Sequence, residues 1–208
     1  MVIRFLLWKD SVRTLNDYQI VLNPVLQLRT MIRQVSIHGS VFDLMKLSHT
    51  PYNKINIHIG GVYGDKVSAM ERFCKNFERL PDSVKSRLTV ENDDKASMYS
   101  VQDLYDGVYK VIGIPIVFDY HHHRFNDGGL SEREALELAM TTWGDIVPVV
   151  HYSESRSIEQ EDDKIRPQAH SDYVYDYIDT YDNRVDIMVE AKAKELAVIK
   201  YKKTHGII

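Results

Sequence analysis

Short runs of apolar and β-branched residues recur along the chain, and between them apolar residues recur with a helical period. The runs are continuous rather than alternating, which is typical of strands buried on both faces of a sheet. Each run ends in polar or glycine-rich residues. The predicted strands cover residues 35–38, 55–60, 88–91, 114–119, 146–151 and 185–190.

The segments between these strands predict helices. Apolar residues at Met70, Phe73, Cys74 and Phe77 have the i, i+3, i+4, i+7 spacing of a helix with one buried stripe, and a proline follows its last turn. This spacing predicts a helix over residues 70–77. A last helix is predicted from about residue 192, and it carries leucine and isoleucine at positions 196 and 199.

Polar residues mark the ends of two further helices. Ser100 opens one of them, with Asp103 at its third position and Gly113 at its end. Ser131 and Glu134 form a capping box that opens the other, which runs to about residue 143.

Strands and helices alternate at a spacing of roughly thirty residues. This order favours parallel strands joined by right-handed crossovers, as in a barrel or a doubly wound sheet. No G-x-G-x-x-G follows any strand, and the glycines at positions 60, 61 and 64 lack the GK[ST] of a phosphate-binding loop. Residues 155–168 are polar and predict a long loop. No composition break marks a linker, so we expect one domain over residues 1–208.

Composition narrows the class of protein. The chain has 208 residues, a formal net charge of −4, nine histidines and a single cysteine. Cys74 cannot form an internal disulfide, and the first residues are too short an apolar run for a signal peptide or a membrane span. We therefore expect a cytoplasmic protein. The negative charge argues against a generally basic nucleic-acid binder, but divalent cations could offset clustered acids locally.

Each predicted strand ends at a side chain that can bind a metal. In parallel α/β folds the carboxyl ends of the strands converge on one face, so these groups would share one crevice. Buried acids and imidazoles need a compensating charge, and mixed histidine and carboxylate ligands suit Mn, Zn, Fe or Co. The strand-end residues are His38, His58, Glu91, Asp119, His151 and Glu190.

A run of three histidines follows the fourth predicted strand. On a continuing strand His121 and His123 share a face with Asp119, because the side-chain period is two residues. If the chain turns after Asp119, His122 becomes available instead. Spacing alone leaves both alternatives open.

Six short motifs resemble those of the UV damage endonuclease (UvdE) family, in the family's order. They are residues 58–66 (HIGGVYGDK), 90–95 (VENDDK), 117–123 (VFDYHHH), 151–153 (HYS), 170–173 (HSDY) and 186–192 (DIMVEAK). The resemblance implies an α/β fold of the TIM-barrel type. Residues 2–8 look like the family's second strand, so we expect an N-terminally shortened member with about seven parallel strands. The open barrel edge would then need cover, from a second copy or another partner.

The resemblance also implies an activity. The family uses up to three divalent metals, commonly manganese, to cut damaged double-stranded DNA immediately 5′ to a UV photoproduct; Mg²⁺, Co²⁺ and Zn²⁺ are alternatives. Carried over by motif position, catalysis would involve Glu91, His151, His170 and Glu190. The metal ligands would be His38, His58, Glu91, Asp119, His122, His151 and Glu190. Here the resemblance selects His122 from the triple.

DNA contacts are expected from aromatic and basic side chains on the site face. Aromatic rings stack on or wedge beside distorted bases, and cationic groups bind phosphates. The stacking candidates are Phe42, Tyr63 and Tyr152, and the phosphate-binding candidates are Lys66, Lys164 and Arg166.

The chain departs from the family at several positions. Val149 stands where the family has a modified lysine, Val41 stands where it has a glutamine that probes the damaged bases, and no histidine precedes His38. These differences leave two alternatives to a lesion endonuclease. One is a shortened, catalytically altered or inactive relative that binds DNA, and the other is an abasic-site nuclease or another metal-dependent barrel enzyme. A shortened enzyme would suit a phage or another compact genome.

Overall fold

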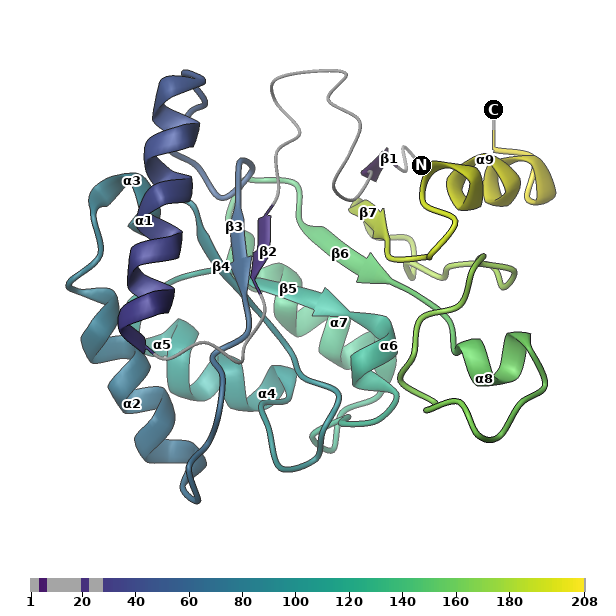
Figure 1. The fold of residues 1–208 in the computed structure, drawn as a ribbon, viewed down its shortest axis with the longest axis horizontal. Coiled ribbons are helices and arrows are strands. Elements are labelled where there is room, and N and C mark those ends of the chain that lie inside the picture. The colour runs from purple at the N-terminus through teal and green to yellow at the C-terminus, as the bar shows by residue number, and fades with distance from the viewer. Residues whose placement is uncertain (1–3, 7–19, 23–27, 208) are drawn as a thin grey trace.

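The computed structural model describes residues 4–6, 20–22 and 28–207, and its strands are all parallel (Figure 1). In the sheet they lie in the order β1-β7-β6-β5-β4-β3-β2. Strands β3 to β7 curl into a half-barrel, with β2 and β1 at its two edges. The strands are β1 (Arg4–Leu6), β2 (Ile20–Leu22), β3 (Ile55–Ile57), β4 (Leu88–Glu91), β5 (Ile116–Asp119), β6 (Val149–Tyr152) and β7 (Asp186–Val189).

Helices connect the strands and cover the outer side of the half-barrel. Helices α1, α4 and α7 pack against β3 and β5 (Figure 1). The helices are α1 (Leu28–Leu44), α2 (Lys66–Phe77), α3 (Asp82–Lys85), α4 (Val101–Leu104), α5 (Lys110–Ile112), α6 (Tyr120–His123), α7 (Glu132–Met140), α8 (Arg156–Glu159) and α9 (Glu195–Thr204). In the described part of the chain, none of them is long and apolar enough to cross a membrane.

The first predicted strand is wrong, because residues 35–38 belong to helix α1. Val35 and Phe42 are buried there, whereas Ile37 and Val41 between them are exposed. The buried pair is seven positions apart, which is a helical repeat. A window of four apolar residues is too short to show that repeat. The other five predicted strands are confirmed within a few residues at their ends.

The predicted capping residues are confirmed, whereas α7 ends at Met140, before the predicted end near residue 143. Ser100 with Asp103, and Ser131 with Glu134, both form reciprocal capping boxes. Gly113 ends the first of these helical segments in the left-handed conformation, with a φ of 71°. Its interior differs from a regular α-helix, because a π-turn at Tyr105–Tyr109 joins α4 to α5. The last helix begins at residue 195 and buries alanine, valine and tyrosine, whereas Leu196 and Ile199 are exposed.

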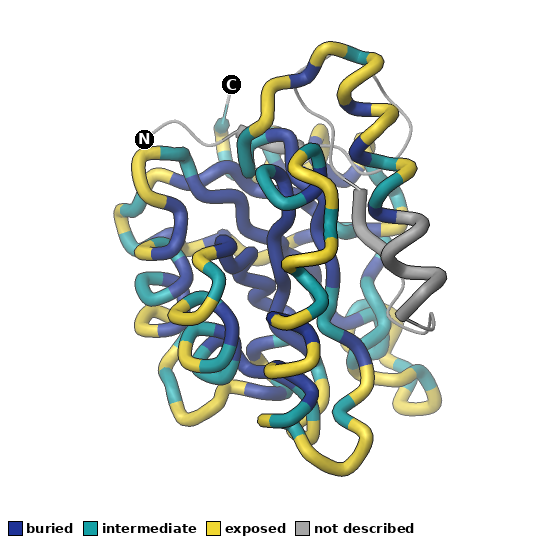
Figure 2. Tube along the Cα trace, turned by 90° about the vertical axis from the view of Figure 1, so that its left-hand side faces the viewer, coloured by how far each residue is buried: buried dark blue, intermediate teal, exposed yellow. Residues whose placement is uncertain are grey.

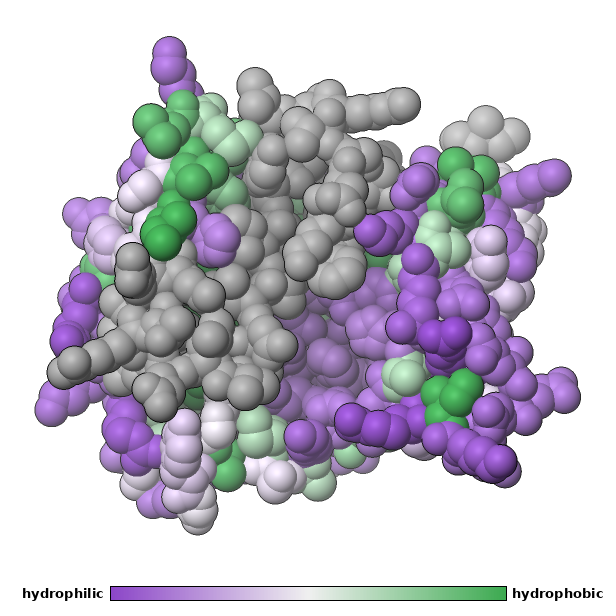
Figure 3. Space-filling model, viewed as in Figure 1, coloured by the Kyte–Doolittle hydropathy of each residue, from purple (hydrophilic) through white to green (hydrophobic). Residues whose placement is uncertain are grey.

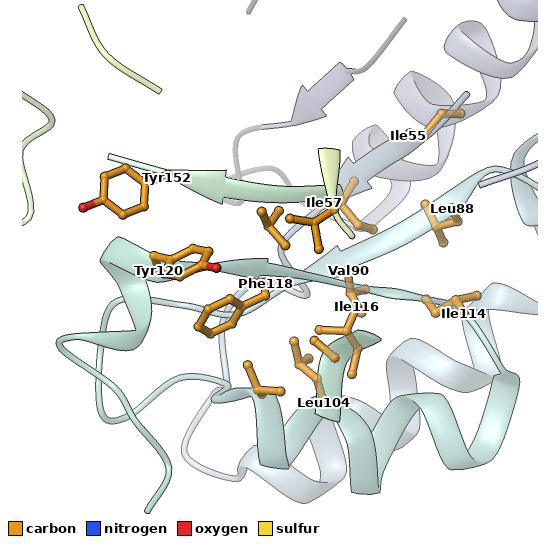
Figure 4. Close-up of a cluster of buried hydrophobic side chains, with 14 of the residues drawn as sticks. Ile55, Ile57, Leu88, Val90, Leu104, Ile114, Ile116, Phe118, Tyr120 and Tyr152 are labelled. Atoms are coloured by element: carbon orange, nitrogen blue, oxygen red, sulfur yellow. The ribbon is translucent and has the colours of Figure 1, made fainter. Parts of the chain in front are cut away.

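The pleat of the strands separates two environments. Alternate side chains point outward and pack under the helices, among them Ile57, Val90 and Phe118 with Leu104 of α4 (Figure 4). The intervening side chains point into the half-barrel. Figure 2 shows the resulting buried centre inside an exposed shell of helices and loops.

The inner side of the strands changes character along its length. On β5, β6 and β7, the inner residues Val117, Val149 and Met188 form a small separate apolar cluster with Trp143. Two residues further along each of these strands, the inner positions are occupied by Asp119, His151 and Glu190. On these three strands the fold therefore places polar side chains directly above apolar ones.

The cap of α7 gives a test of the fold. Ser131→Ala removes the hydroxyl that accepts from the backbone N–H of Glu134, and we expect it to lower the free energy of unfolding by about 1 kcal/mol. Ser131→Gly should cost only a few tenths of a kcal/mol, because glycine is a good N-cap residue. Urea denaturation measures both values. Equal losses in the two variants would contradict the role of the cap.

Candidate metal centre

Five of the strand-end residues meet inside the carboxyl end of the half-barrel. His58 follows β3, Glu91 and Asp119 are the last residues of β4 and β5, His151 lies in β6 and Glu190 follows β7. Side-chain exposure is 1% for Glu91, 0% for Asp119 and His151, and 12% for His58 and Glu190. Residues far apart in the sequence therefore share one largely buried site.

Glu91 lies at the centre of this cluster. Its Oε1 is 3.4 Å from Nδ1 of His122 and 3.9 Å from Nε2 of His58, and its Oε2 is 3.3 Å from Nδ1 of His151. The same Nδ1 is 3.3 Å from Oε1 of Glu190. One carboxylate thus contacts three imidazoles from three different segments.

The donor atoms form two groups that share Glu91. One is His58, Glu91 and His122, the other is Glu91, Asp119 and His151, and within each group the donor atoms lie within 4.8 Å of one another. Imidazole and carboxylate donors suit Mn, Fe, Co or Zn. Oδ2 of Asp119 is buried and makes no hydrogen bond to the residues that the structure describes. A cation would satisfy this oxygen, so the cluster fits a metal site with two neighbouring positions.

The electrostatics of the cluster follow from the burial of opposite charges. Burial lowers the pKa of His58 and His151, but the charge of Glu91 and neighbouring carboxylates outweighs it and raises these pKa values to about 10 and about 9. Burial likewise opposes ionisation of Glu91, yet the surrounding imidazoles hold the pKa of its carboxyl below the usual range. Glu190 differs, because burial raises its pKa.

Hydrogen bonds from two asparagines, through the side chain of Asn56 and the backbone of Asn92, orient the residues of the cluster. Nδ2 of Asn56 donates a hydrogen bond to Oε2 of Glu91, and Oδ1 of Asn56 accepts one from the hydroxyl of Thr89 at 2.8 Å. The carbonyl oxygen of Asn92 lies 2.9 Å from Nδ1 of His122. A carbonyl can only accept, so Nδ1 carries the proton and Nε2 has its lone pair available for a metal. Sequence patterns do not predict these partners, because a buried Asn in a strand has no distinctive spacing.

The structure decides between the alternatives for the three histidines. Asp119 caps α6 by accepting from the backbone N–H of His122 at 2.8 Å, so the chain turns after β5. His122 then enters the cluster. His121 packs its ring against His170, with centroids 5.7 Å apart, and His123 packs against Phe118.

Asp93 is a further member of the cluster, and the strand-end pattern does not predict it. Its Oδ1 lies 3.1 Å from Nδ1 of His58, and the residue is 6% exposed. The motif around Glu91 includes this aspartate, but a residue two positions past a strand end is usually a surface group. Its burial depends on the turn in which Asp93 and Tyr99 pair through their backbones at 2.8 Å.

Several predicted site residues lie elsewhere. His38 is in the middle of α1 and belongs to neither donor group found among the described residues. Phe42 is fully buried, with the guanidinium of Arg87 over its ring. Tyr152 is 2% exposed and accepts a hydrogen bond from Arg124 at 3.1 Å. The stacking roles predicted for Phe42 and Tyr152 do not fit this structure, because neither ring is accessible to a base.

The remaining predicted DNA contacts are at the surface. Tyr63 is 86% exposed and Lys164 and Arg166 are exposed, whereas Lys66 is held by Asp103 at 2.8 Å. His170 is 31% exposed and lies 3.7 Å from Glu190 through its Nδ1. It therefore stands at the rim of the cluster rather than within it.

A pocket of about 350 Å³ opens onto the cluster. Its lining includes His58, Asp93, Lys95, His122, Arg166 and His170. On the face in Figure 3, hydrophilic side chains gather over the segments that follow β6 and β7, beside a hollow. Solvent and a substrate therefore have access to two of the imidazoles.

The fold and the cluster together define the class of protein. It is a parallel α/β protein with a cluster of histidines and carboxylates at the carboxyl ends of its strands. Residues 20–206 match the family of UV-endonuclease UvdE, and the chain belongs to this family. It is 36% identical over 179 residues to the UV DNA damage endonuclease of Bacillus mycoides, and 36% identical over 180 residues to that of a Bacillus cereus strain.

These matches cover 81% and 82% of this chain and 53% of each relative, so the chain spans about half the length of the curated relatives it matches. The crystal structure of SacUVDE is similar to this structure, with a TM-score of 0.72 and 31% sequence identity. That similarity covers 91% of this chain and 64% of the other.

The charge pairs make stability depend on pH. The folded-state pKa values of His58 and His151 lie above their ordinary value of 6.5, so their contribution is complete below about pH 6.5 and is lost as the pH rises through 9 to 10. We expect the free energy of unfolding of the metal-free protein to fall between about pH 7 and 10. Urea denaturation in a chelator measures it. Glu91→Gln should flatten this dependence, and a flat wild-type curve would contradict the charged pairs.

Proposed function

We propose that this protein is a metal-dependent DNA repair endonuclease that nicks damaged double-stranded DNA immediately 5′ to UV photoproducts. The observation that carries the proposal is a single buried carboxylate, Glu91, shared by two three-donor groups, one of which lines an open pocket through His58 and His122. Family membership supports the substrate and the lesion. The donor chemistry favours Mn²⁺ over Ca²⁺.

Two neighbouring ions would be held by the cluster. His58, Glu91 and His122 would hold one, and Glu91, Asp119 and His151 the other, with Glu190 beside His151. When bound, such ions supply Lewis-acid activation of water and neutralise phosphate charge. His38 is left out of this ligand set, since α1 does not bring it to the cluster.

The protein's own residues position the substrate. His170 stands at the rim, where its imidazole can hydrogen-bond a phosphate oxygen or transfer a proton to the leaving oxygen. The carboxylates of Glu91, Asp93, Asp119 and Glu190 would repel a phosphate in the absence of cations. Productive DNA binding therefore depends on the same cations as the cleavage.

The environment of Val149 favours two metal positions rather than three. This residue is fully buried in the apolar layer with Val117 and Met188, below His151. Its isopropyl side chain offers no donor atom to the cluster, unlike the lysine that the family has at this position.

Cleavage tests the proposal. Purified protein with Mn²⁺ should nick a UV-irradiated duplex at the phosphodiester 5′ to the lesion, mapped on a sequencing gel. Glu91→Gln should lower kcat/KM by at least about a thousandfold, because removing the shared carboxylate disrupts both metal positions.

Glu137→Gln is the matched control, since this glutamate lies on the exposed face of α7 in a pair with Arg133. Its activity should equal that of the wild type. Cutting of abasic but not UV-irradiated DNA would reject the lesion assigned here, and nicking that survives Glu91→Gln would reject the site.

The orienting role of Asn56 gives a second test that does not depend on cleavage. Asn56→Ala removes the hydrogen bond to Glu91, and we expect the Kd for Mn²⁺ to rise by about 10- to 100-fold. Isothermal titration calorimetry measures this value. Asn53→Ala is the control, because Asn53 is equally buried but bonds to Ser48. Identical Kd values in both variants would contradict the role of Asn56.

A further inference from the structure

A second pocket, of about 430 Å³, adjoins the first at residues 168–170, and the rest of its lining follows β7. We call it the lysine pocket, and its lining includes His170, Glu190, Lys192 and Lys194. It shares residues 168–170 with the pocket over the cluster. The two pockets therefore flank the rim of the candidate metal centre, with His170 in both.

Backbone hydrogen bonds fix the loop that carries the two lysines. The N–H of Lys192 donates to the carbonyl of Ser171 at 2.9 Å, and the N–H of Ala193 donates to that of Asp172 at 3.0 Å. The loop is thereby bonded to the residues that directly follow His170. The two lysines and His170 are held as one unit.

Lys194 has a backbone conformation that lysine rarely adopts. Its φ is 52° and its ψ is −122°, a region populated almost entirely by glycine. Such strain concentrates at functional sites, where surrounding structure enforces it. Here the enforced conformation brings a lysine into the pocket next to His170 and Glu190.

Lys192 supplies a second positive charge. It is exposed, and within the described part of the chain no carboxylate lies within ion-pair distance of it. By contrast, Lys66 and Lys110 are paired with aspartates. An exposed lysine without an ion-pair partner, next to the candidate metal centre, suits an anion that extends from the lysine to the metal centre.

The pocket over the cluster has basic groups of its own on the opposite flank, Lys95 and Arg166. A linear polyanion crossing the rim at His170 would meet positive charge on both sides of the cluster. A backbone of regularly spaced phosphates has this form, whereas a small anion would engage only one flank.

We infer that the lysine pocket is a binding site for a DNA backbone phosphate next to the scissile one, with Lys192 and Lys194 as its cationic groups. The inference rests on the proposed function and adds the direction in which the strand crosses the site. One flanking phosphate contacts Lys192 and Lys194, and the strand continues over His170 toward Lys95 and Arg166.

The experiment uses the full chain with Mn²⁺ and a UV-irradiated duplex, and measures nicking kinetics over a series of salt concentrations. Lys192→Ala and Lys194→Gly should each raise KM roughly fivefold near 0.1 M salt, with kcat little changed. The slope of log(kcat/KM) against log[salt] should become shallower by about 0.9 for each phosphate that the variant no longer neutralises.

Stability separates binding from folding. Lys194→Gly relieves the strained backbone, so its Tm should be no lower than that of the wild type while its KM rises. A fall in Tm of several degrees would overturn the role of strain at this position. Lys203→Ala is the matched control, because Lys203 is exposed on α9, which follows this loop, and lines neither pocket.

The outcomes distinguish the two proposals. Wild-type protein that nicks the lesion, with KM and salt slope unchanged in Lys192→Ala and Lys194→Gly, would overturn the lysine pocket alone. An equal effect of Lys203→Ala would overturn it too, since surface charge in general would then explain the loss. Wild-type protein that neither binds nor nicks DNA would overturn both proposals.

Discussion

A buried carboxylate surrounded by imidazoles is the interaction on which the rest of the site depends. An isolated carboxylate with the burial of Glu91 would be neutralised, because the desolvation of a charge costs several kcal/mol. Three histidines from three segments keep it ionised, and Asn56 holds one of its oxygens in place. The strand order of the half-barrel brings these segments together. The charges of the site therefore compensate one another only in the folded chain.

The two layers inside the half-barrel explain how this arrangement is supported. Because the strand period is two residues, Val117, Val149 and Met188 lie directly beneath Asp119, His151 and Glu190. These apolar side chains lie below the site on β5, β6 and β7, whereas the same inner positions of β3 and β4 hold Asn56 and Thr89, which bond to each other, and Asn56 also bonds to Glu91. In a buried environment charges interact strongly, and each unpaired hydrogen-bond donor or acceptor destabilises the fold. Val149 packs in this apolar cluster, and a charged side chain at position 149 would have to be buried there.

Sequence patterns predict the parts of this structure that depend on local spacing. The strand-end residues His58, Glu91, Asp119, His151 and Glu190 and the capping boxes at Ser100 and Ser131 are of this kind, because their positions follow from strand and helix periods. The same patterns miss Asn56 and Asp93, since the roles of these residues depend on contacts with Glu91 and His58 across neighbouring strands. They misplace His38 for a different reason, because a short apolar run has the same pattern in a strand and in a buried helix face.

Protons and cations compete for the same lone pairs in this cluster. The raised pKa values of His58 and His151 mean that the metal-free site binds protons at neutral pH, and these protons supply the positive charge that the carboxylates require. A divalent ion must displace them, since only a neutral imidazole is a ligand. The two protonated imidazoles offset part of the negative charge of Glu91, Asp93, Asp119 and Glu190, and bound divalent ions would offset more of it, so the four acidic side chains can lie close together. This leaves no spare positive charge for a phosphate in the metal-free form, so attraction of a polyanion has to come from bound cations and from lysines outside the cluster.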